Sequence, residues 1–138
     1  MGEAESTDAC AAEIERLHRV LQGWLSGAVP CSAEEFAAFS DAHIPEFTLI
    51  TGDGAELTRD QVIGSVRSAH GSAERLRIRT HGTRLAAADT RLLVASFTEQ
   101  HSGTPDARSR RCTAVFERDP SAPHGLRWRH LQETYLDR

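Results

Sequence analysis

Four segments in the second half of the chain alternate apolar and polar side chains, and they constrain the fold more than any other feature. They span residues 75–87, 92–101, 108–118 and 126–136. A period of two is the pattern of a strand, because successive side chains point to opposite faces. The connections between these segments are short, which makes neighbouring strands antiparallel. The second half therefore predicts a four-stranded meander.

The first half of the chain changes to a helical period. Ile14, Leu17, Leu21 and Leu25 recur at three- and four-residue spacing, which predicts an amphipathic helix from about residue 10 that ends at Gly27. Residues 1–10 before it are expected to be flexible, and residues 11–138 to form one domain.

Two further helices are predicted from their N-terminal signals. Ser32 with Glu35, and Thr58 with Gln61, each have the spacing of a capping box. The first of these helices is expected to end at Pro45. A short strand at 46–51, a Gly52–Gly54 turn and a brief returning strand lie between the two helices. The whole chain is thus predicted to be α+β, with helices packed in a curved antiparallel sheet of four long strands plus a short hairpin.

Symmetric turns in the meander would sort its side chains onto two faces. One face would collect polar groups, beside Trp128: His81, Thr83, Ser96, Thr98, Arg111, Thr113, His130, Gln132 and Thr134. The other would collect mainly apolar groups: Ile78, Ala95, Phe97, Cys112, Ala114, Phe116, Leu131 and Tyr135. Glu99 and Arg110 would oppose each other on this second face and form an ion pair. The polar face could meet water, or it could line a cavity while a second subunit covers the apolar face; periodicity does not choose between these arrangements.

Composition excludes several classes of function. The chain has 138 residues and a net charge of −4, which argues against a nucleic-acid partner. No apolar run approaches the roughly 20 residues of a membrane span, and the acidic start does not resemble a signal peptide. A cytoplasmic protein is expected, with Cys10, Cys31 and Cys112 as reduced thiols.

No local motif indicates a metal or another cofactor. The seven histidines are scattered, and neither a His-x-x-x-His nor a Cys-x-x-Cys pair occurs. The sequence predicts no metal site and no cofactor, although it leaves open a set of ligands assembled across strands. No glycine-rich phosphate loop and no serine nucleophile elbow is present either.

Three segments and their order resemble a known family. They are FTLITGDG at 47–54, RCTAVF at 111–116 and WRHLQETY at 128–135. With the helices before them, they are similar to the NTF2-like superfamily, and within it to the SnoaL-like and DUF4440 groups. The resemblance implies a cone-shaped α+β fold with a pocket inside the cone, and a homodimer that forms through the outer sheet face. It names no function, since this fold serves enzymes and binding modules alike.

Two departures from the family weaken a catalytic interpretation. Many DUF4440-like chains carry histidines at the positions of Gln132 and Thr134, and these neutral residues cannot transfer protons in their place. The related steroid isomerases keep a carboxylate near the position of Thr51. We therefore expect a small organic molecule to bind in the cone without proven catalysis. The expected ligand-binding residues are Trp24, Phe39, Thr98, Arg111, Thr113, His130, Gln132 and Thr134.

Two alternatives remain at this point. The first is an isomerase or cyclase that acts on a ring-bearing, polyketide- or steroid-like metabolite. His130 would be its catalytic base, because an imidazole titrates near neutrality, and Arg111 would stabilise the developing negative charge. The second is a non-catalytic dimerisation module.

Overall fold

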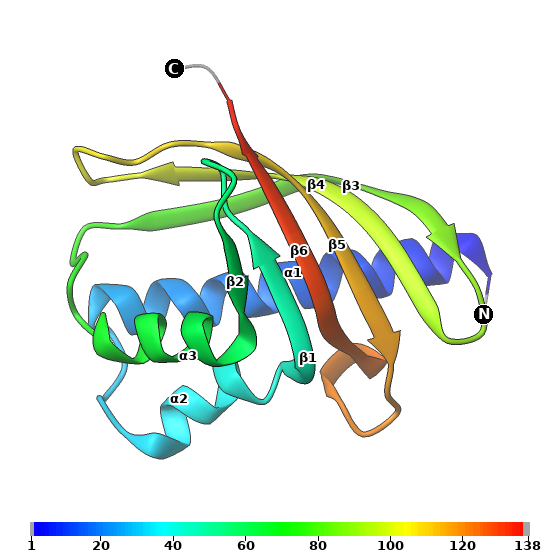
Figure 1. Cartoon of the computed structure of the whole chain (residues 1–138), viewed down its shortest axis with the longest axis horizontal. Coiled ribbons are helices and arrows are strands. Elements are labelled where there is room, and N and C mark those ends of the chain that lie inside the picture. Colours follow the sequence, from blue (N-terminus) through cyan, green and yellow to red (C-terminus); the bar gives the residue numbers. More distant parts are fainter. Residues whose placement is uncertain (1, 137–138) are drawn as a thin grey trace.

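The fold consists of three helices packed with one curved, six-stranded sheet (Figure 1). The computed structural model describes residues 2–136. Its elements are α1 (Glu3–Ser26), α2 (Ala33–Ser40), β1 (His43–Ile50), β2 (Glu56–Thr58), α3 (Arg59–Ser68), β3 (Arg77–Ala88), β4 (Leu92–Ser102), β5 (Arg110–Arg118), the 3-10 turn η1 (Pro123–Gly125) and β6 (Leu126–Tyr135).

Helix α1 begins earlier than predicted. It starts at Glu3, so the expectation that residues 1–10 are flexible is wrong for residues 3–10. Ser6 and Cys10 continue the buried stripe of Ile14 and Leu17 at helical spacing, and their small side chains hid this in a hydrophobicity pattern. The helix ends as predicted at Gly27, whose φ of 77° is the left-handed conformation that glycine adopts readily.

The caps of the two shorter helices are largely as predicted. The Ser32 hydroxyl accepts a hydrogen bond from the Glu35 N–H at 3.2 Å, and Thr58 with Gln61 forms a complete capping box. Helix α2 already ends at Ser40. Pro45 instead lies inside β1, so the prediction that this proline ends the helix is wrong.

The six strands form one sheet in the order β2-β1-β6-β5-β4-β3. The four-stranded meander and the β1–β2 hairpin confirm the prediction. The sheet is mixed rather than antiparallel, because β1 pairs parallel to β6. This pairing joins segments about 80 residues apart in sequence, as His43 opposite Trp128 illustrates, and no turn signal announces such a crossover. The sheet curves around α1, which lies along its concave side (Figure 1).

The meander registers match the expected ones over most of their length. Thr98 pairs with Arg111, Ser96 with Thr113, and Thr113 with Gln132. The exception in the last pair of strands is a bulge in β6: Val115 pairs with His130, but Phe116 pairs with Trp128. An extra residue in one strand moves the next side chain to the other face. Trp128 therefore lies on the apolar face and not beside His130.

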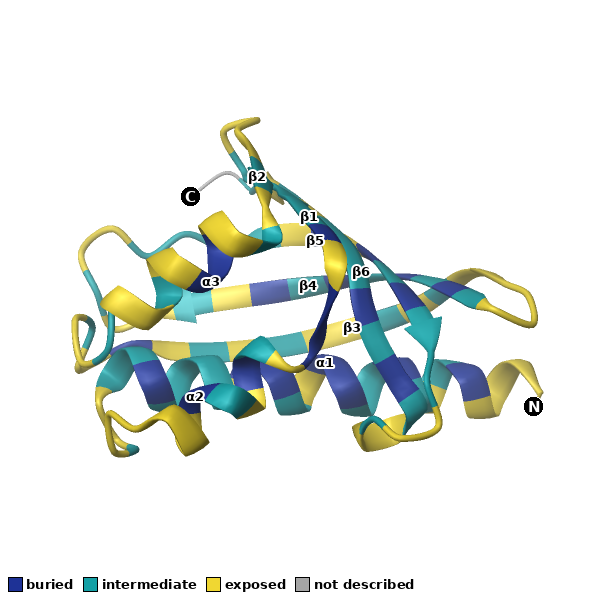
Figure 2. Cartoon of the chain, turned by 60° about the horizontal axis from the view of Figure 1, so that its bottom comes forward, coloured by how far each residue is buried: buried dark blue, intermediate teal, exposed yellow. Residues whose placement is uncertain are grey.

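The apolar face is the inner one. Buried residues gather where the sheet and α1 face each other (Figure 2), and Ala95, Phe97, Ala114 and Phe116 join the core there. The polar face lies on the outside of the cone. The arrangement in which the polar face lines an interior cavity is therefore wrong, because burial of the apolar side chains against α1 dominates the packing.

Candidate functional site

The predicted polar row is brought together, but on the outer face. Arg111, Thr113, Gln132 and Thr134 are exposed there, and Thr98 beside them is half-buried. They are neighbours by strand register, with Arg111 opposite both Thr98 and Thr134. Their predicted contact with a ligand would thus take place on an open surface.

His130 also lies on this outer side, at the junction between β1 and β6. Its Nδ1 lies 2.7 Å from Oγ1 of Thr48, its register partner on β1, and the side chain is half-buried. This hydrogen bond ties the parallel strand to the meander, which is a structural role. The role of His130 as a base stays a prediction.

Trp24 and Phe39 lie away from the polar row. Both are buried and border a hollow of about 210 Å³ between α1 and α2, which Phe36 also lines. Trp24 donates its indole N–H to the carbonyl oxygen of Val66 at 2.7 Å, and its ring centroid is 4.8 Å from that of Phe36. The eight predicted ligand-binding residues therefore do not form one site.

A different group of titratable side chains meets on the inner face. Glu99 on β4 is 2% exposed and lies between two histidines. Its Oε2 is 2.9 Å from Nε2 of His18 on α1, and its Oε1 is 2.5 Å from Nε2 of His101 on the same strand. The expected Glu99–Arg110 ion pair is not formed, although the two residues are opposite in register; Arg110 pairs with Glu133 at 3.4 Å.

His18 is held as an imidazolium. Its Nδ1–H donates to the backbone carbonyl of Ile14 at 2.7 Å, so that nitrogen carries a proton. Nε2 faces a carboxylate, which accepts only, so it carries one too. Burial alone would lower the pKa of His18, but the charge and hydrogen bond of Glu99 raise it above its ordinary value. Conversely, burial would raise the pKa of Glu99, and the two histidines hold it well below its usual range.

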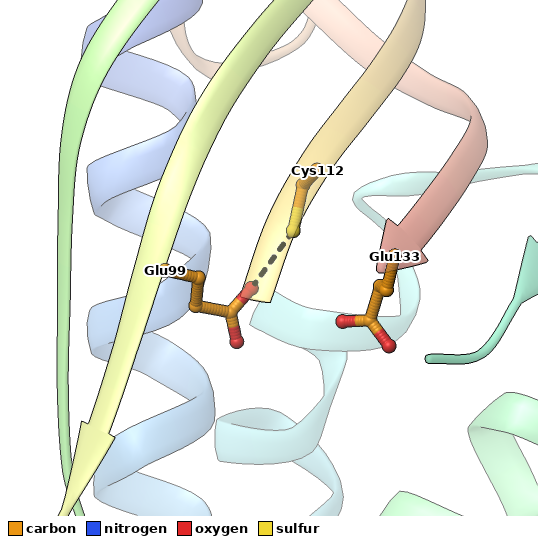
Figure 3. A group of neighbouring side chains, drawn as sticks. All are labelled: Glu99, Cys112 and Glu133. Atoms are coloured by element: carbon orange, nitrogen blue, oxygen red, sulfur yellow. Dashed lines mark hydrogen bonds between the residues drawn. The ribbon is translucent and has the colours of Figure 1, made fainter. Parts of the chain in front are cut away.

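Cys112 and Glu133 complete this inner cluster from the next two strands. The Cys112 thiol donates to Oε2 of Glu99 at 3.7 Å, and Cys112 is opposite Glu133 in register. Figure 3 shows the three side chains projecting to the same side of the sheet. Their potential metal-ligand atoms all lie within 4.8 Å of one another. Burial, then the nearby charge of Glu99, raises the pKa of Glu133, so this carboxyl retains its proton to higher pH than Glu99 does.

Two arginines and a tyrosine border the cluster. The guanidinium carbons of Arg108 and Arg110 lie 4.1 and 5.1 Å from the ring centroid of Tyr135. The Nε atoms of both arginines are buried without a hydrogen-bond partner in the described part of the chain. Such donors are available to a polar ligand that enters here.

The cluster is buried without being sealed. The side chains of His101 and Glu133 keep 13% and 11% of their surface exposed. On the other side, His18 also borders a groove of about 380 Å³ between α1 and β3, which is lined further by Gln22 and Ile78. The cluster therefore meets solvent through the edges of His101 and Glu133 and through the groove beside His18.

The sequence analysis did not predict this site, because its candidate residues were chosen from the polar face of the sheet and this cluster lies on the apolar face. Glu99 was expected to be a structural ion-pair partner, and His18 was not singled out. One signal was available: Glu99 and Glu133 are carboxylates that interrupt the apolar face beside Phe97 and Leu131. Burying a charge is costly unless a partner compensates for it, so carboxylates at these positions indicate ion-pair or hydrogen-bond partners on other elements.

Comparison with known proteins identifies the type of fold. No protein-family model matches the chain, and no curated protein does. In the described residues, no helix is long and apolar enough to span a membrane. Solved structures do match, and together with the arrangement of helices and curved sheet they show that this chain has an NTF2-like fold.

Three of the matching structures illustrate the range of sequence identity and structural similarity. An NTF2-like protein of unknown function from Pseudomonas aeruginosa is 29% identical, covers 94% of this chain and 99% of its own, and has a TM-score of 0.85. A candidate aromatic ring hydroxylase from Novosphingobium aromaticivorans is 10% identical over 100% of this chain and 94% of its own, with a TM-score of 0.71. A candidate ketosteroid isomerase from Parabacteroides distasonis is 12% identical over 78% of this chain and 80% of its own, with a TM-score of 0.56. The last two share the fold alone with this chain.

Proposed function

We propose that the protein binds a small organic molecule at the inner-face cluster and transfers a proton to or from it. The observation that carries the proposal is the buried carboxylate of Glu99, held between two histidines beside a second carboxyl group with a raised pKa. Neighbouring titratable groups whose pKa values are pushed apart are the arrangement that acid–base catalysts use.

His101 is the proposed base. Its Nε2–H donates to Glu99, so in the neutral ring the lone pair is on Nδ1. Among the described residues, no hydrogen-bond partner lies at that Nδ1. A histidine that is oriented by a carboxylate through one nitrogen and free at the other can accept a proton from a substrate.

Glu133 is the proposed acid. Its raised pKa keeps it protonated in a range where Glu99 is ionised, so it can donate a proton to a developing oxyanion. The neighbouring Arg110 guanidinium stabilises the negative charge left on Glu133 after donation. Removal of a proton from carbon by His101 and delivery of a proton to oxygen by Glu133 convert the ketone into its enol. Return of the proton from His101 to another carbon, with recapture of the enol proton by Glu133, then completes an isomerisation and restores both groups.

A ring-bearing carbonyl compound is the proposed substrate class. The half-buried Tyr135 provides aromatic surface beside the cluster, and the unpartnered Nε donors of Arg108 and Arg110 suit a carbonyl oxygen. The ring chemistry in the names of two similar proteins supports this class, although those names describe those proteins.

Proton exchange at carbon tests the proposal directly. The probe is 3-cyclohexen-1-one, a ring ketone with acidic α-protons, incubated with the protein in deuterated buffer that contains a chelator and followed by NMR. We expect exchange faster than in buffer alone, and a loss of about 100-fold or more in His101→Asn. Exchange at the buffer rate, or undiminished exchange in His101→Asn, would refute the proposal.

His130→Asn is the matched variant, since His130 is also a half-buried histidine on a long strand. Retained exchange in this variant supports His101 as the base. If exchange is lost in His130→Asn and kept in His101→Asn, the base is His130, as in the isomerase alternative drawn from the sequence.

We also propose that two copies pair through the outer sheet face. Val94 and Val115 are register partners there and remain only half-buried in one chain. Such apolar side chains at the middle of an open sheet face suit a self-complementary interface.

A further inference from the structure

Four metal-ligating side chains converge on the inner face from three strands and a helix. They are His18 from α1, Glu99 from β4, Cys112 from β5 and Glu133 from β6. We infer that these four residues form a binding site for a divalent transition-metal ion of the zinc or cobalt type. The inference goes beyond the proposed proton transfer and does not require it, because metal binding needs no substrate.

The distances between the ligand atoms suit this inference. Oε2 of Glu99 is 2.9 Å from Nε2 of His18 and 3.7 Å from Sγ of Cys112, and the three-residue group with Glu133 lies within 4.8 Å. Ligands bound tetrahedrally to zinc at about 2.0–2.3 Å lie about 3.3–3.7 Å apart. The ligand atoms of Glu99, Cys112 and Glu133 are therefore already near the spacing of a tetrahedral site. His18, whose Nε2 contacts Glu99, is the fourth ligand and must turn toward the other two side chains.

The surroundings of the group supply a second, independent observation. His18 donates its Nδ1–H to the carbonyl of Ile14, which leaves Nε2 as the nitrogen that faces the cluster. His101 likewise holds the other oxygen of Glu99. Metal-bound histidines and carboxylates are typically oriented by such hydrogen bonds from an outer shell. The direction of two ligands is thus set before a metal ion arrives.

Metal binding releases protons to solvent. The ion replaces the Nε2 proton of His18, the thiol proton of Cys112 and, where Glu133 is still protonated, its carboxyl proton, and the freed lone pairs become ligands. A bound thiol is deprotonated outright whatever its pKa in the free protein. Imidazole, carboxylate and thiolate together suit zinc and cobalt, whereas magnesium and calcium prefer oxygen ligands alone.

Cobalt titration of the whole protein, after treatment with chelator and reductant, tests the inference. We expect saturable binding of one Co²⁺ per chain with a thiolate-to-cobalt charge-transfer band in the near ultraviolet. Zn²⁺ should displace the cobalt. Cys112→Ser should abolish the band, and Glu133→Gln should weaken binding about 10- to 100-fold. Cys31→Ser is the matched control, since Cys31 is an exposed cysteine away from the cluster, and it should change neither.

Several outcomes would overturn the inference. They are an absence of saturable binding, a band lost in Cys31→Ser but kept in Cys112→Ser, or unchanged affinity in Glu133→Gln. Should Cys112→Ser fail to fold, the partly exposed Glu133 still decides the question. The titration uses no ketone and the exchange assay contains chelator, so failure of the metal site and failure of the proposed proton transfer are distinguishable.

Discussion

At the scale of single residues, Glu99 illustrates how a buried charge is tolerated. Transfer of a carboxylate out of water costs several kcal/mol. Glu99 recovers this cost through hydrogen bonds from His18, His101 and the Cys112 thiol. Charge-assisted hydrogen bonds of this kind are stronger than neutral ones, and the low dielectric of the core strengthens them further.

Glu99→Gln should therefore destabilise the protein strongly. The change removes the negative charge and leaves His18 without its counter-charge in the core, which should lower the free energy of unfolding by about 3–5 kcal/mol. Urea denaturation near neutral pH measures this loss. The control is Glu15→Gln in the exposed Glu15–Arg19 pair, which should cost less than about 1 kcal/mol. Equal stabilities of the two variants would show that Glu99 is not held by charge.

At the scale of elements, the bulge in β6 decides which face each side chain meets. Trp128 is fully buried on the inner face and donates its indole N–H to Oε2 of Glu13 at 2.9 Å. His130, two residues later, lies on the outer face. Strict alternation would have placed both on one face, and only the extra residue Arg129 separates them.

The junction of α2 and β1 makes folding stability dependent on pH. His43 is 3% exposed, donates its Nδ1–H to the carbonyl of Phe39 at 2.9 Å, and has its pKa lowered to about 4 by burial. In the unfolded chain its pKa is about 6.5. Between these values the unfolded state binds a proton that the folded state does not, so stability falls as the pH falls through this window.

We expect this loss to reach about 3 kcal/mol, at about 1.4 kcal/mol per pH unit for one proton. Urea denaturation at several pH values from about 7 down to about 4 measures the slope. His43→Gln should reduce that slope by one proton, and His81→Gln, at an exposed position of β3, should not. An unchanged slope in His43→Gln would show that this histidine does not couple protonation to folding.

At the scale of the whole molecule, the outer sheet face is predicted to pair with a second copy. A twofold axis through this face brings residues near its centre against their own copies. Thr113→Glu, in the middle of β5, should therefore place like charges together and dissociate the dimer. Sedimentation at micromolar concentration measures this, with the exposed Ser65→Glu on α3 as the control. A monomeric wild-type protein would contradict the predicted dimer.

Much of the fold could be predicted because its signals are local. Helix caps at Ser32 and Thr58, the stop at Gly27 and the meander registers each depend on residues close together in sequence. Capping residues predict where the helices begin and end, and the period of two predicts the strands and their registers. The parallel β1–β6 pairing and the buried start of α1 depend on contacts between distant segments, so local patterns could not specify them.

The sequence by itself determined that the sheet has one polar and one apolar face, and which residues belong to each over most of its length. Only the tertiary structure decided which face is inside. The side chains of α1 bury the apolar face, and this brings His18 within hydrogen-bonding distance of Glu99, 81 positions later in the chain. The candidate functional site consequently consists of the charged residues within the apolar face, and not of the polar row around His130. The physical reason is that hydrophobic burial selects a whole face at once, and any titratable side chains on that face are buried with it.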